Sequence, residues 1–327
     1  MEGKQEGWEH FAAAEWAAAR DAFAAALAAD PGDAEALDGL GQALWWLGER
    51  GAGVERRREA YAAYRRLGDD RRAGGLAVYL AAEQRIDGRE AEAAGWMARG
   101  RRLLSGQDAA PELGWLEIEE AKRSEDPAVA EAHCRRALAL AHELQDANIE
   151  CMALAQLGRA LVRQGRVGEG TRLLDEAMTV ALGGEAEDPL ACGDACCTTL
   201  VVCDGIADLG RACEWCEAVV AFTERRRFIP VQSWCRAIYA SVLIRAGEWE
   251  RADAVLVEAL RRRPQRQRSS GDLLALGTLA ELRLRQGRLE EAEALLAGLD
   301  DEASALGPLV HLRLERGEVD LARALLA

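Results

Sequence analysis

The chain has 327 residues, a formal net charge of −15 and a sequence pI near 4.9. Half of the residues are hydrophobic, which is typical of a folded protein and argues against disorder. No apolar run approaches the ~18 residues of a membrane span, the N-terminal residues lack the pattern of an export signal, and the excess of acids disfavours a basic nucleic-acid binder.

Hydrophobic residues recur with a helical period along almost the whole chain. Apolar side chains fall at i, i+3, i+4 and i+7 in stretches such as 11–29, 151–162 and 273–284. No sustained alternation of apolar and polar residues indicates a strand. The seven prolines and most paired glycines fall between these stretches, where they can end helices. The sequence therefore predicts an all-α fold.

The first helical stretch matches the tetratricopeptide repeat, a unit of two helices, A and B, joined by a turn. The segment GWEHFAAAEWAAARDAFAAALAADPGD begins at Gly7 and ends beyond Pro31. It places Ala14 at the turn position, which is position 15 of the repeat. Trp16 follows at position 17 and the small residue Ala19 at position 20. Helix B must lie close to helix A at position 20, so a large side chain there would clash.

The same template recurs down the chain with a spacing that varies around the standard repeat length. Position 20 is alanine or glycine each time, as the close helix approach requires. We therefore expect these nine residues to be buried between paired helices: Ala19, Gly53, Ala93, Ala130, Gly170, Ala212, Ala252, Ala292 and Ala322.

Position 15 of the repeat is glycine in six of the nine units. Glycine can take the left-handed backbone conformation that ends helix A and turns the chain into helix B. The middle of the chain departs from this pattern, since Glu125 replaces the turn glycine. The six turn glycines are Gly48, Gly88, Gly165, Gly247, Gly287 and Gly317.

These repeats predict a tetratricopeptide-like right-handed superhelix, an α-solenoid of about nine helix pairs. One helix pair cannot bury its apolar face alone, so neighbouring pairs stack, and the A helices line a concave groove. Although the length also fits two domains, the repeats predict a single array over residues 1–327. The last repeat reaches Ala327 in the middle of its helix B, without a polar capping helix. We therefore expect a fragment, or an array that continues in its parent protein.

The chain resembles the N-terminal regions of bacterial LuxR-type transcriptional regulators. The resemblance rests on the segments EALDGLGQALWWLGE, GEWERADAVLVEALRR and RQGRLEEAEALL, and on Cys196-Cys197 and Trp215-Cys216-Glu217-Ala218. Proteins of this kind have a helix-turn-helix DNA-binding domain after the repeats, and residues 1–327 contain none. The resemblance thus implies a sensing or partner-binding region that meets DNA only through a domain outside this chain.

Seven of the nine cysteines lie between Cys192 and Cys235. Cys213 and Cys216 have the spacing of half a zinc site or a redox pair. No histidine lies in this segment, however, and the cysteines occupy positions that suit small apolar residues. We therefore favour packing and predict no metal site and no cofactor, with metal binding or redox sensing as the alternative. Reduced thiols and the absence of an export signal are typical of a cytoplasmic protein.

A row of basic residues lies near the end of helix A in successive repeats. In a superhelix this edge borders the concave groove, where arginines could bind a carboxylate, a phosphate or an acidic peptide. The alternative is that each cation stabilises the C-terminus of its own helix. The candidate groove residues are Arg85, Lys122, Arg123, Arg159, Arg163, Arg245 and Arg285.

Tryptophan supplies nine of the seventeen aromatic residues. Trp16 and Trp249 occupy position 17 of their repeats and are expected in the core. Trp46 and Trp115 occupy positions 13 and 5, which line the groove. Aromatic side chains in a groove are good recognition anchors, and burial against the next repeat is the alternative for both.

Enzymatic chemistry has little support in the sequence, because neither a His-Glu-x-x-His motif nor a phosphate-binding glycine loop occurs. We predict a non-enzymatic interaction or effector-sensing region, with a protein, a peptide or a small acidic effector as partner. Oligomerisation is left open, and no membrane partner is expected. The alternative function is a free-standing scaffold that assembles partner proteins.

Overall fold

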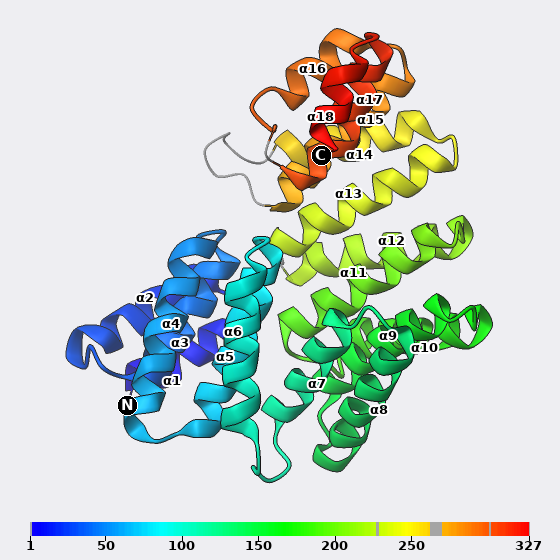
Figure 1. The fold of residues 1–327 in the computed structure, drawn as a ribbon. Helices are drawn as coiled ribbons and strands as arrows, with labels where there is room; N and C mark the ends of the chain where they lie inside the picture. Colours follow the sequence, from blue (N-terminus) through cyan, green and yellow to red (C-terminus); the bar gives the residue numbers. More distant parts are fainter. Residues whose placement is uncertain (1, 227–228, 262–269, 301, 327) are drawn as a thin grey trace. The chain divides into compact units, whose positions relative to one another are not determined.

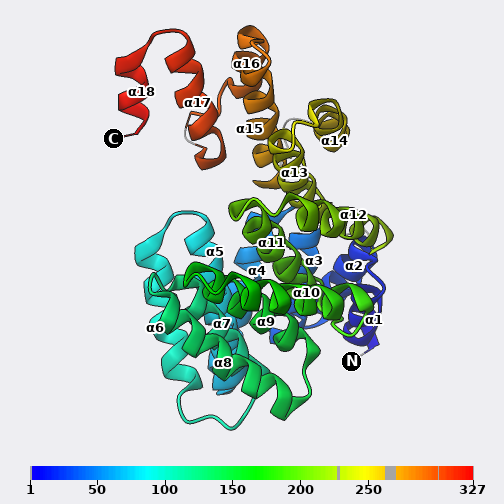
Figure 2. The ribbon, with the colours of Figure 1, turned by 90° about the vertical axis from the view of Figure 1, so that its right-hand side faces the viewer.

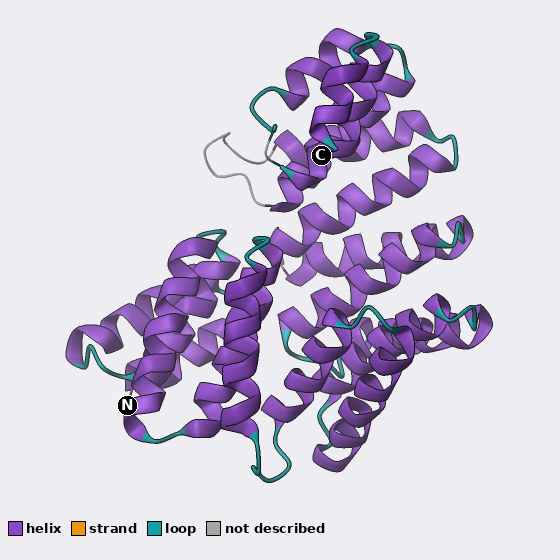
Figure 3. Cartoon of the chain, viewed as in Figure 1, coloured by secondary structure: helices purple, strands orange, loops and turns teal. Residues whose placement is uncertain are grey.

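The computed structural model describes residues 2–226, 229–261, 270–300 and 302–326. Within these residues the chain is built of helices and short turns without a strand, as Figure 3 shows. The predicted all-α class is therefore confirmed. No helix of this part of the chain is both long and apolar enough to cross a membrane. The chain divides into two compact units, residues 1–199 and 200–327. The single array over residues 1–327 stays a prediction.

Unit 1 is made of helices that follow one another in pairs, with a short turn inside each pair (Figure 1). In three places the first helix of a pair also contacts the first helix of the next pair: α1 with α3, α5 with α7 and α7 with α9 (Figure 2). The helices are α1 (Glu2–Ala12), α2 (Trp16–Ala29), α3 (Ala34–Trp46), α4 (Arg50–Leu67), α5 (Asp70–Ile86), α6 (Glu90–Leu104), α7 (Pro111–Arg123), α8 (Pro127–Leu144), α9 (Ala147–Arg163) and α10 (Val167–Gly183).

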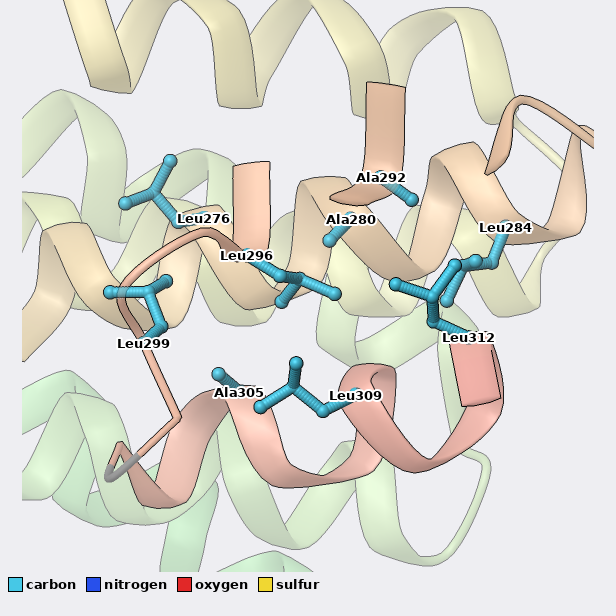
Figure 4. Packing of buried hydrophobic residues seen from close by; sticks show 9 residues of the cluster. All are labelled: Leu276, Ala280, Leu284, Ala292, Leu296, Leu299, Ala305, Leu309 and Leu312. Carbon is cyan, nitrogen blue, oxygen red and sulfur yellow. The ribbon is translucent and has the colours of Figure 1, made fainter. Parts of the chain in front are cut away.

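The helix α11 (Pro189–Gly205) begins in unit 1 and ends in unit 2, whose other helices continue the alternation. Leucines and alanines of α15, α16 and α17 form one apolar cluster between these three helices, shown in Figure 4. The helices of unit 2 are α12 (Leu209–Arg226), α13 (Ile229–Arg245), α14 (Trp249–Arg261), α15 (Ser270–Arg285), α16 (Leu289–Leu296), α17 (Ala303–Glu315) and α18 (Val319–Leu325).

The small residues at position 20 are buried in every repeat, as predicted. The seven alanines among them are no more than 3% exposed, and both glycines are buried. The glycines show why size matters here. A Cβ on Gly53 would lie 2.6 Å from the carbonyl oxygen of Gly41, and one on Gly170 would lie 2.5 Å from that of Gly158. In these two repeats the paired helices thus touch backbone to backbone.

The turn between the paired helices is left-handed, as the glycines at position 15 predicted. All six of these glycines have positive φ, between 71° and 85°. Ala14 and Ala207 take the same conformation at φ 57° and 58° although they have side chains, which is unfavourable for residues other than glycine. At Glu125 the turn is built differently, without a positive φ.

Replacing Gly170 by alanine should lower the free energy of unfolding of the chain by about 1–3 kcal/mol, since overpacking a close contact forces the backbones apart. Gly168 is the matched control, because it lies in the same helix α10 and a Cβ there meets nothing within 4 Å. Gly168→Ala should raise stability by up to about 1 kcal/mol through helix propensity. Urea unfolding of both variants tests this, and equal effects would contradict the close-contact explanation.

Candidate functional site

One face of the first helix in each pair of unit 1 borders a partly enclosed cavity of about 500 Å³. Its lining comes from α1, α3, α4, α5, α7, α9 and α11, and all lining residues lie between Trp8 and Asp194. A cavity of this size is within the range of small-molecule sites, about 300–1,000 Å³. It is therefore the candidate ligand site of unit 1.

The repeat itself places the lining residues. Positions 2, 5, 9 and 12 are three or four residues apart, so they fall on one face of helix A. In α3, α5 and α7 all four positions line the cavity, and in α9 and α11 position 2 does so. These residues are Glu35, Asp38, Gln42 and Trp45; Gly75, Val78, Ala82 and Arg85; Glu112, Trp115, Glu119 and Lys122; Met152; and Asp194.

Arg57 reaches the cavity from α4, the second helix of its pair. It can do so because Gly41 of α3 has no side chain, and a Cβ there would lie 2.5 Å from Arg57 Cγ. The guanidinium carbon lies 3.5 Å from the centre of the Tyr79 ring, and Nε lies 2.8 Å from Asp38 Oδ1. Arg57 therefore joins α3, α4 and α5 at the cavity wall.

The Tyr79 hydroxyl has unused hydrogen-bonding capacity. It is buried and completes no hydrogen bond within the described residues, whereas Arg57 Nε and Asp38 Oδ1 are paired with each other. Burial raises the pKa of Tyr79, as does the nearby carboxylate of Glu83. Because buried polar groups are normally hydrogen-bonded, the hydroxyl points to a ligand or ordered water in the cavity.

A second polar group lies where α7, α9 and α11 approach the cavity. Lys122 Nζ of α7 lies 2.6 Å from Asp194 Oδ1 of α11, and Gln156 of α9 donates a hydrogen bond to the other oxygen at 3.0 Å. Burial lowers the pKa of Lys122, but Asp194 and Glu119 outweigh this and leave it raised. The charged pair thus connects two repeats that are not neighbours in sequence.

The structure places the predicted basic row in several different settings. Arg85 and Lys122 line the cavity, and both approach Glu119, at 3.5 and 3.4 Å. Arg123 lies outside the lining and approaches Glu90 at 4.0 Å. Arg159 of α9 occupies position 9, which lines the cavity in α3, α5 and α7, but Arg159 itself is not part of the lining. Burial lowers its pKa.

Three arginines of the row make contacts away from the cavity. Arg163 donates to the carbonyl oxygens of Ser124 and Glu125, at 3.3 and 2.6 Å, beyond the end of α7. In unit 2, Arg245 donates to the carbonyl oxygen of Asp204 at 3.0 Å, near the end of α11. Arg285 pairs with Glu281 of its own helix. Each of these contacts gives its arginine a structural role. A binding role for the row stays a prediction.

The predicted tryptophans also lie in different settings, at the cavity, in the core or at the surface. Trp115 is half-buried and lines the cavity. Trp46 borders it as well, but it is 4% exposed and stacks on Trp16 with ring centres 5.1 Å apart. Trp16 is buried, as expected, whereas the expectation for Trp249 is wrong: it is 37% exposed and donates to the Ile244 carbonyl. It lies at the start of α14, and its indole N–H binds a carbonyl oxygen near the end of α13.

The cysteines are mostly packed in the interior. Five of the seven between Cys192 and Cys235 are buried, and Cys197 and Cys213 are half-buried. Burial raises the pKa of Cys196 and Cys216, which makes these thiols poor nucleophiles. Among the described residues, no group of three or more histidine, cysteine or acidic side chains is arranged to hold a metal ion.

Comparison with known proteins gives the fold but no closer relationship. No family model matches the chain, and no curated protein does. Among solved structures, the tetratricopeptide repeat sensor STAND protein (signal transduction ATPase with numerous domains) from Pyrococcus horikoshii matches with a TM-score of 0.52 and 13% identity, over 94% of this chain. The fold is tetratricopeptide-like. This chain spans 47% of that protein's length.

Human IFIT1 is similar as well. Its dimer with m7Gppp-AAAA matches with a TM-score of 0.55 and 14% identity, over 95% of this chain and 67% of the IFIT1 chain. The dimer with PPP-AAAA matches with a TM-score of 0.54 and 15% identity. At these identities the likeness shows the shared helical repeat fold alone.

Removing the cation of the Lys122–Asp194 pair should destabilise unit 1. Lys122→Met leaves a largely buried carboxylate without its cation, which costs on the order of 3 kcal/mol. Adding Asp194→Asn should recover part of this loss, giving a coupling energy in a double-mutant cycle. Arg136→Met is the control, since Arg136 is 52% exposed in its pair with Glu117 and should cost about 1 kcal/mol or less. Equal losses in urea unfolding would contradict a bridging role.

Proposed function

We propose that unit 1 is a sensor that binds a small ligand, or the end of a short peptide, in the cavity lined by the A helices. The observation behind this proposal is the cavity itself, about 500 Å³ with walls from seven helices. A long extended peptide would need an open groove, whereas this space suits a ligand that is largely surrounded. The Tyr79 hydroxyl and the Trp45 indole N–H, both buried without a hydrogen bond within the described residues, supply polar partners for such a ligand.

The sensor works in this proposal by shifting a conformational equilibrium. A ligand that touches α3, α5, α7 and α11 together binds best when these helices converge, and therefore favours that arrangement over a more open one. The tetratricopeptide region of the Pyrococcus horikoshii protein is described as a sensor, which is compatible with this role. The segments that resemble LuxR-type regulators support a bacterial, cytoplasmic regulator whose DNA-binding domain lies outside this chain.

We propose no enzymatic activity for this chain. Among the described residues that line the cavity there is no histidine, cysteine or serine, so the nucleophile–base pairs typical of acyl transfer are missing. The lining also differs from what a capped or triphosphate RNA, as bound to IFIT1, would require. The four cations of the lining already pair with carboxylates, so none is available for a phosphate.

Thermal unfolding of the chain against a panel of bacterial metabolites tests the sensor. A ligand at 100 times its dissociation constant should stabilise the protein by about 2.7 kcal/mol and raise Tm accordingly. Ala82→Trp fills the cavity and should abolish the rise. Ala139→Trp, on the exposed side of α8, is the matched control and should keep it.

Two results would count against the cavity as the site. One is a ligand whose Tm shift survives Ala82→Trp. The other is a combination of two observations. Neither the panel nor a metabolite extract shifts Tm, and the chain captures a stable protein partner whose binding Ala82→Trp does not disturb. The second result would favour the scaffold function instead.

A further inference from the structure

The cavity is lined by charged side chains and by many aromatic rings. Seven carboxylates and four cationic side chains line it, together with six rings of tryptophan and tyrosine. Lys4, Arg50 and Arg71 pair with three of these carboxylates from outside the lining. Aromatic faces attract cations within about 6 Å, and a carboxylate left without a cation favours a ligand of opposite sign.

The cations of the lining already have acidic or aromatic partners. Arg57 pairs with Asp38 at 2.8 Å and covers Tyr79. Lys122 pairs with Asp194 at 2.6 Å, and Arg85 approaches Glu119 at 3.5 Å. An anionic ligand would therefore have to displace a carboxylate from each cation that it approached. The displaced carboxylate would remain in the same partly enclosed space, where removal from water makes charges costly.

The carboxylates of the lining are paired as well, with one exception. Lys4, Arg50 and Arg71 reach Glu35, Glu83 and Glu112 from outside the lining, and lining cations pair with Asp38, Glu119 and Asp194. The exception is Asp188, which lines the cavity at the start of α11 and has no cation of the described residues within 4 Å. Its Oδ1 accepts the Leu190 backbone N–H at 2.7 Å.

We propose that the ligand of the cavity is a small organic cation, with an ammonium or guanidinium group on a short apolar frame. This inference rests on the proposed sensor function. The charge of the ligand lies near Asp188, and its frame packs on aromatic rings such as those of Trp45 and Trp115. The Trp45 indole N–H is buried and lacks an acceptor within the described residues. It therefore suits a hydroxyl or carbonyl oxygen on the same ligand.

Three probes of matched length separate charge from shape: 1,5-diaminopentane is a dication, 1,5-pentanediol is neutral, and glutarate is a dianion. Isothermal titration calorimetry of the full chain should show the diamine binding at least about tenfold more tightly than the diol, and no heat of binding for glutarate. Choline and its neutral isostere 3,3-dimethylbutan-1-ol form a second matched pair, which should show the same preference for the cation.

Asp188→Asn removes the charge while asparagine can still cap α11, since Asp and Asn are equally good N-caps. It should weaken diamine binding by about tenfold. Glu143→Gln is the matched control, because it makes the same change of net charge on the exposed side of α8 and should leave the affinity unchanged.

The inference is overturned if glutarate or the diol binds as tightly as the diamine, or if neither cation binds at millimolar concentration. It is also overturned if Asp188→Asn and Glu143→Gln have equal effects. A neutral or anionic ligand whose binding Ala82→Trp abolishes would overturn the cation inference and leave the sensor function in place. Failure of the sensor function shows separately, as a lack of any ligand that depends on the cavity.

Discussion

The contact between Gly41 of α3 and Gly53 of α4 connects the packing of a repeat to the formation of the cavity. Without side chains, the two helices touch through their backbones, and a Cβ on Gly41 would lie 2.8 Å from the Gly53 carbonyl oxygen. The same missing side chain lets Arg57 pass from α4 to the face of Tyr79. One small residue therefore sets the distance between the paired helices and admits the central guanidinium of the cavity.

The charged residues of the cavity follow from this tight packing. Lys122, Asp194 and Gln156 come from three different repeats, yet they form one hydrogen-bonded group. Charges removed from water need partners of opposite sign, and Asp188 is the one lining carboxylate without a cation within 4 Å among the described residues. Burial raises its pKa, and backbone hydrogen bonds together with the charge of Arg57 offset only part of this. This carboxylate is the basis of the proposed preference for positive charge.

The sequence was sufficient to predict the repeat but only part of the cavity. Ala93 and Gly165 could be assigned because position 20 tolerates only small residues and position 15 requires a left-handed turn, and both rules are local. The stripe at positions 2, 5, 9 and 12 was also readable, and extending it from Trp115 to Glu112 and Glu119 would have found more of the lining. Arg57 could not be found this way, because it enters from the second helix through the gap at Gly41.

The role of the arginine row depends on contacts between repeats. Arg163 binds carbonyl oxygens 38 and 39 residues earlier in the chain, a distance that no periodicity within a helix reveals. In the same way, the 500 Å³ of the cavity depends on how closely α3, α7 and α11 converge, which is a property of stacked repeats. Local patterns fix each helix pair, whereas the space between pairs depends on how whole surfaces pack.

The charge and enclosure of the cavity can be measured directly without knowledge of its ligand. Ala82→Cys and Ala139→Cys would each be modified with a trimethylammonium-ethyl and a sulfonato-ethyl methanethiosulfonate, and the rates read from the modified peptides by mass spectrometry. An enclosed, carboxylate-rich cavity predicts a larger cation-to-anion rate ratio at residue 82 than at residue 139, and protection of residue 82 alone from a bulky reagent. Equal ratios and equal access at the two positions would contradict it.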